Sequence, residues 1–64
     1  MTKTEAAEIL ALDVRVFARQ YGIKITKDLV EARLSEALHL GGLKTVAAQV
    51  APSWRTILRI ARTS

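Results

Sequence analysis

Apolar residues recur every three or four positions along most of this 64-residue chain. One such series is Val30, Leu34, Ala37 and Leu38, which would lie on one face of a helix. No stretch alternates apolar and polar residues for long enough to predict a strand. We therefore expect an all-α chain that forms a compact bundle of about five short helices. Their expected ranges are about 3–11, 14–21, 27–40, 43–51 and 54–62.

Residues that favour helix ends mark these boundaries. Thr2 and Glu5 have the spacing of a capping box, in which each side chain bonds the other residue's backbone amide. Asp13 is a good N-cap, so the sequence predicts a break at this point and a second helix after it. Gly22 would end that helix in the left-handed conformation, and Thr26 would cap the next one.

The chain carries the same skeleton twice. Residues 6–19 and 46–59 are identical at four aligned pairs, Ala7/Ala47, Ala11/Ala51, Arg15/Arg55 and Arg19/Arg59. Each copy would contain a short helix, a tight turn, an N-cap and a second helix that begins with arginine. This order is typical of a helix-turn-helix unit, whose second helix enters the major groove of DNA. We expect one or two such units in a single domain of residues 1–64, with 3–21 and 43–61 as an internal repeat joined by the central helix 27–40.

Two segments resemble a known family of DNA-binding domains. KTEAAEILALDVRVFARQYGI looks like the end of a Fis-type helix-turn-helix domain, and it is also similar to the first helices of MerR- and excisionase-type proteins. GGLKTVAAQVAPSWRTILR again resembles the Fis type, with Gly-Gly ending one helix and Ser-x-Arg-Thr-x-x-Arg opening the last. It departs from that family at its turn, where Ala51 and Pro52 replace a glycine and an apolar residue. The resemblance implies a DNA-binding homodimer, in which the first copy could instead form the dimer surface.

Positive charge gathers in the last third of the chain. The formal net charge is +4, and residues 44–64 contain four basic side chains and no acidic one. Such an asymmetry fits a surface that faces a polyanion such as DNA. The alternative is a solvated basic face without a ligand.

The last helix would place its arginines on one stripe. Arg55, Arg59 and Arg62 are spaced four and three residues apart, which is the repeat of one helix face. In a helix that lies in the major groove, we expect Arg55, Thr56 and Arg59 to face base edges. The expected phosphate contacts are Ser53, Lys44 and Arg62.

Other candidate residues have a weaker case for contacting DNA. Arg15 and Arg19 hold the equivalent positions in the first copy, where nearby acids reduce the field, and a structural role is an equal alternative. Trp54 is expected to pack in the core or in a subunit interface rather than to stack on a base. His39 has no cysteine or second histidine near it, so we do not expect a metal site.

Composition argues against several other classes of protein. There is no cysteine, no histidine with a catalytic partner and no glycine-rich phosphate loop, so we expect neither an enzyme nor a cofactor. Charged residues interrupt every apolar run, which predicts no membrane segment and a cytoplasmic protein. As a DNA-binding protein it would be nucleoid-associated. Half of the residues are hydrophobic, which favours a homodimer in a chain this short. The second candidate function is a protein-binding module, such as a phage- or plasmid-type inhibitor of a host protein, with the helix-turn-helix as its scaffold.

Overall fold

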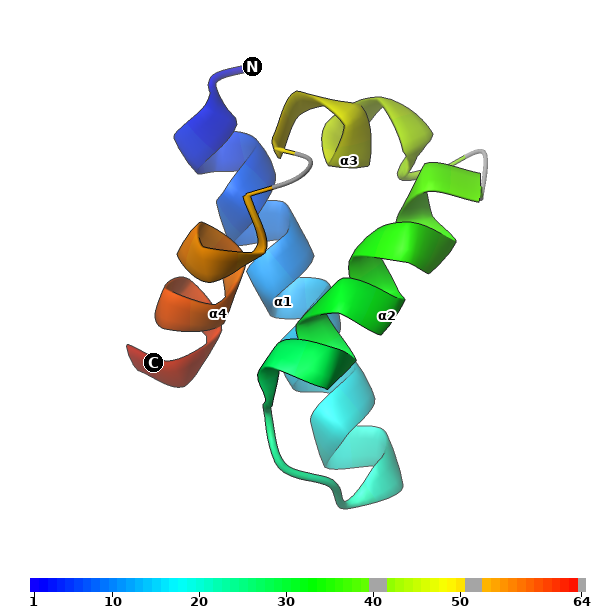
Figure 1. Cartoon of the computed structure of the whole chain (residues 1–64), viewed down its shortest axis with the longest axis vertical. Coiled ribbons are helices and arrows are strands. Elements are labelled where there is room, and N and C mark those ends of the chain that lie inside the picture. Colours follow the sequence, from blue (N-terminus) through cyan, green and yellow to red (C-terminus); the bar gives the residue numbers. More distant parts are fainter. Residues whose placement is uncertain (40–41, 51–52, 64) are drawn as a thin grey trace.

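The computed structural model describes residues 1–39, 42–50 and 53–63. These ranges contain four helices and no strand, so the all-α prediction is confirmed. The helices are α1 (Lys3–Tyr21), α2 (Lys27–His39), α3 (Lys44–Val50) and α4 (Trp54–Thr63). Figure 1 shows α2 and α4 on either side of α1, with α3 bridging the start of α1 and the end of α2.

Both ends of α1 follow from local sequence rules. The capping box is present: the backbone N–H of Glu5 donates to the Thr2 hydroxyl at 3.1 Å, and the N–H of Thr2 donates to the Glu5 carboxylate at 3.0 Å. At the other end Gly22 has φ of 63°, the left-handed conformation that favours glycine. Its N–H and that of Ile23 bond the last free carbonyls of the helix, Arg19 and Ala18, which is the Schellman arrangement.

The expected break before Asp13 is wrong, because α1 runs without interruption for 19 residues. Neither proline nor glycine lies within this range, and aspartate inside a helix costs only a few tenths of a kcal/mol. The Asp13 carboxylate does not cap a helix; it accepts two hydrogen bonds from Arg33 on α2. A tertiary contact has therefore overridden the local capping preference.

Because α1 is continuous, two predictions are wrong: the number of helices, and a helix-turn-helix unit in residues 3–21. Residues 1–39, 42–50 and 53–63 form four helices where we expected about five. Residues 3–21 form one helix, whereas the aligned range 43–61 spans α3 and α4, so the two copies do not share a fold. Gly41 and the turn residues Ala51 and Pro52 lie outside the described residues.

The core lies where α3 and α4 pack onto α1 and α2. Four of the six buried residues of α1 are alanine, and these short side chains let neighbouring helices approach closely. Among the described residues, α3 and α4 make little direct contact with each other, and each packs mainly on α1 and α2. The helix-turn-helix expected for residues 43–61 therefore lacks extensive packing between its own two helices. The buried residues are Ala6, Ala7, Leu10, Ala11, Val14, Ala18, Leu29, Val30, Leu34, Ala37, Ala47, Val50, Ile57 and Ala61.

Candidate nucleic-acid interface

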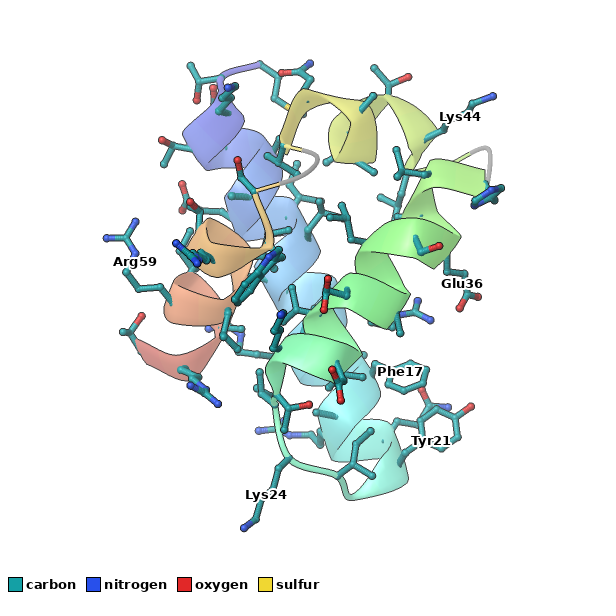
Figure 2. The ribbon with its side chains drawn as sticks, in the orientation of Figure 1. Phe17, Tyr21, Lys24, Glu36, Lys44 and Arg59 are labelled. Atoms are coloured by element: carbon teal, nitrogen blue, oxygen red, sulfur yellow. The ribbon has the colours of Figure 1, made fainter. Side chains whose placement is uncertain are left out.

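Helix α4 has one apolar face and one basic face. Ile57 and Ala61 are buried against the bundle, whereas Arg55, Arg59 and Arg62 are all exposed. The helical repeat places the three arginines on one side, opposite the buried pair. Figure 2 shows the side chain of Arg59 extending away from the ribbon into solvent. The predicted arginine stripe is thus an exposed row of side chains.

Among the described residues, no carboxylate forms an ion pair with an arginine of α4. Both ion pairs among the described residues use Arg33, which binds Asp13 and Glu36. Arg62 instead donates from Nε to the Ile25 carbonyl oxygen at 3.2 Å, which holds the end of α4 on the loop before α2. Arg59 lies beside Glu8 of α1 without forming an ion pair with it, so the three arginines remain available to an anionic ligand.

Trp54 anchors the start of α4. Its ring is partly buried and packs against the core, as the sequence favoured. Lys27 Nζ lies 4.8 Å from the ring centroid, and the Arg55 guanidinium carbon lies 5.4 Å from it. These cation–π contacts bring Lys27, which the sequence analysis did not select, close to the basic face of α4.

A shallow depression lies between the start of α1 and α4. It is lined by polar side chains from both elements, including Ser53, Thr56, Arg59, Lys3 and Thr4. The first three are predicted DNA contacts that the fold brings together. The sequence analysis did not select Lys3 as a DNA contact. Its position in the sequence indicates only the start of a helix, and its closeness to α4 depends on how the helices pack.

Lys44 does not join this group. It begins α3, and Figure 2 shows it and Arg59 pointing away from opposite sides of the molecule. A single helix docked in a groove through Arg59 would leave Lys44 remote from the same groove. Lys44 thus lies outside the cluster that its predicted role requires.

Arg15 and Arg19 project from α1 rather than from a second recognition helix. Both line a shallow groove beside Ala61 of α4, together with the apolar residues Leu12, Val16, Ile23 and Ile25. Arg15 is partly buried and Arg19 is exposed. The structure gives these two residues an apolar neighbourhood that differs from that of the α4 arginines.

The side of α1 opposite Arg15 and Arg19 carries a network of contacts with α2. Arg33 donates from Nε and Nη2 to the Asp13 carboxylate at 3.0 and 3.2 Å, and its guanidinium carbon lies 4.5 Å from the centroid of the Phe17 ring. The hydrogen bond to Asp13 raises the pKa of Arg33. Phe17 in turn contacts Tyr21, with ring centroids 4.5 Å apart, as Figure 2 shows. These groups hold α1 on α2.

Within the described ranges no group of histidine, cysteine, aspartate or glutamate is arranged to hold a metal ion. Among those same residues, no helix combines the length and apolar character needed to cross a bilayer. Comparisons with models of protein families, with curated proteins and with solved structures gave no match.

Proposed function

We propose that this protein binds double-stranded DNA through the exposed face of α4, as a small transcriptional regulator or nucleoid-associated protein of the cytoplasm. One observation carries the proposal: Arg55, Arg59 and Arg62 form a solvent-facing row in a region with no acidic residue after Glu36. Such a row attracts the phosphate backbone and releases its counterions on binding.

The same helix has the dimensions and side chains for groove binding. Its 10 residues span about 15 Å at 1.5 Å per residue, and a major groove about 12 Å wide admits a helix. Arg55 and Arg59 would reach base edges, where arginine pairs with guanine in two hydrogen bonds. Thr56, which the sequence analysis expected at base edges, would instead bind phosphates with Ser53 and Lys3, because all three line the depression beside the helix.

The test is fluorescence anisotropy with a random-sequence DNA duplex over a series of salt concentrations. We expect log affinity to fall linearly with log salt, with a slope of about −0.9 for each neutralised phosphate. The double variant Arg55→Ala/Arg59→Ala should weaken binding to this duplex and make the slope less steep by about 2, since in a non-specific complex each lost arginine removes about one phosphate contact.

A matched control tests whether DNA binding depends on where a positive charge lies or only on the net charge. Lys44→Ala removes one exposed positive charge from the start of α3, on the opposite side of the molecule from Arg59, and Arg59→Ala removes one from α4. We expect Lys44→Ala to bind almost as the parent protein does, because Lys44 lies remote from a groove occupied by α4 and salt screens distant charges. Equal losses from the two single variants would mean that binding depends on net charge and not on α4.

Binding to a protein is the second candidate function. Leu12 and Val16 on α1 are 54% and 57% exposed and line one groove with Ile23, and contiguous exposed apolar patches mark interaction sites. If no DNA binds at low salt, the DNA proposal is wrong and this alternative is favoured.

A further inference from the structure

Helix α1 has a second apolar face that points away from the core. Ile9, Leu12 and Val16 are 37%, 54% and 57% exposed. Their spacing of three and four residues places them on one side of the helix, opposite the buried Leu10 and Val14. We call these three residues the outer stripe of α1.

Charged residues divide this face into an acidic half and a basic half. Glu5 and Glu8 precede Leu12, and Arg15 and Arg19 follow it. Neither of the ion pairs among the described residues involves these four side chains. Like charges three or four residues apart on a helix repel each other slightly, so each half lacks a compensating partner within its own helix.

We propose that the outer stripe binds the outer stripe of a second copy of this chain, with the two α1 helices antiparallel about a two-fold axis at Leu12. Leu12 then meets Leu12 of the second copy, and Ile9 meets its Val16. The acidic half of each helix lies against the basic half of the other. A two-fold interface of this kind uses the same patch on both subunits.

The positions of the charges fit this register. Glu5 and Arg19 are each seven residues from Leu12, so the antiparallel arrangement places them level along the helix axis. Glu8 lies about 6 Å before Leu12 and Arg15 about 4.5 Å after it, at 1.5 Å per residue, so this pair is nearly level as well. If the two helices were parallel, each arginine would instead lie level with the same arginine of the second chain.

The charged residues along one edge of the outer stripe also fit the antiparallel arrangement. Helical periodicity places Glu8, Arg15 and Arg19 along the same edge of the stripe. A two-fold axis that is perpendicular to both helices leaves this charged edge of each helix on the same face of the dimer. Glu8 of one chain and Arg15 of the other therefore meet side by side.

The apolar surface continues beyond the outer stripe. The 19 residues of α1 form a helix about 28 Å long. The apolar groove beside α1 extends the stripe to Ile23, which is 47% exposed, and to Ala61 of α4. An interface of standard size buries about 800 Å² on each partner, which is roughly a fifth of the 4284 Å² surface of this chain. The acidic half opposes binding to an anionic membrane and leaves a second copy as the occupant with matching charge.

The arrangement has a consequence for α4. Arg59, Ile60 and Thr63 of this helix lie beside Thr4 and Glu8, so α4 runs along the charged edge of the stripe. Because the axis preserves that edge, both α4 helices fall on the same face of the dimer. The dimer does not depend on DNA binding, but it would offer two arginine rows to one duplex, as two-fold regulators do.

Sedimentation equilibrium without DNA tests the proposal. We expect the parent protein to have twice its chain mass of 7.0 kDa, and Leu12→Lys to be monomeric because two lysines would meet at the axis. Ala32→Lys is the matched control, since Ala32 is exposed on α2 and away from the stripe. Circular dichroism establishes that each variant is folded. A monomeric parent protein at about 1 mM, or a Leu12→Lys dimer as tight as the parent, would overturn the proposal.

A charge exchange tests the antiparallel register. Glu8→Arg and Arg15→Glu should each weaken the dimer about tenfold or more, because each places like charges together twice in a symmetric interface. The double variant Glu8→Arg/Arg15→Glu should restore affinity to within about threefold, since the pair is reversed and intact. Failure of the double variant to restore the dimer would contradict this register. None of these results depends on DNA, so loss of the DNA proposal leaves this one standing.

Discussion

The guanidinium of Arg33 on α2 holds the carboxylate of Asp13 on α1 through two hydrogen bonds of 3.0 and 3.2 Å. The two side chains are only 15% and 23% exposed, so water competes weakly for either group. This contact joins two residues that are 20 positions apart in sequence and lie on different helices. It also explains why α1 continues through a residue that favours a helix start.

Asp13→Asn should therefore destabilise the fold. Hydrogen bonds between charged groups contribute about 1.5–3 kcal/mol, and in a domain of this size each kcal/mol shifts Tm by about 4–8 °C. Glu31→Gln removes an exposed carboxylate from α2 and serves as the control. Thermal unfolding followed by circular dichroism compares the two, and equal Tm values would show that the Arg33 contact contributes nothing to stability.

Two glycines should respond in opposite directions to alanine. Gly22 has φ of 63°, so Gly22→Ala forces a side chain into the left-handed region at a cost of about 1–2 kcal/mol. Gly42 does not have positive φ, and a Cβ there would meet no atom within 4 Å. Gly42→Ala should be neutral or stabilise by up to about 1 kcal/mol, because alanine restricts the unfolded chain. Urea unfolding measures both, and a loss at Gly42 as large as at Gly22 would refute this distinction.

The close approach of helices at Ala11 leaves no room for a larger side chain. Ala11 has no exposed surface, so Ala11→Leu would overpack the core and cost about 1–3 kcal/mol. Ala32→Leu makes the same substitution at an exposed site on α2 and should change stability little. Chemical denaturation of both variants tests this expectation. A neutral Ala11→Leu would mean that the helices can move apart without loss.

The capping box gives stability a defined pH dependence. The backbone amide of Thr2, and then its hydroxyl, hydrogen-bond the Glu5 carboxylate and lower its pKa below the ordinary value of 4.5. Because the pKa is lower in the folded state, this contribution is complete above about pH 4.5 and is lost as pH falls through the folded-state pKa. The difference in unfolding free energy between the parent protein and Glu5→Gln should then be largest at neutral pH and shrink in acid. Urea titrations across that range provide the measurement, and a difference that stays constant with pH would argue against the carboxylate's role.

Features that depend on neighbouring residues were predictable from sequence, and those that depend on tertiary contacts were not. Thr2 and Gly22 end α1 as expected because capping geometry involves only a few adjacent residues. Asp13 misled the prediction because its partner lies on another helix. Alanine at both copies of a repeat fits two different packings, so sequence identity did not imply the same fold.

The candidate site divides in the same way. The exposure of Arg55 and Arg59 follows from the period of one amphipathic helix, which the sequence contains. The closeness of Lys3 to Thr56 and the remoteness of Lys44 depend on how three helices cross. The exposure of Leu12 could not be predicted from the sequence, because the apolar residues around it suit a buried helix equally well.

The weak direct contact between α3 and α4 has a consequence for motion. Among the described residues, each of these helices packs on α1 and α2 and makes little contact with the other, so opening of one would remove few contacts of the other. We therefore expect amide hydrogens of α4 to exchange with solvent through a local opening that leaves α3 protected. Hydrogen exchange that proceeds at the same rate in both helices would show instead that they open together.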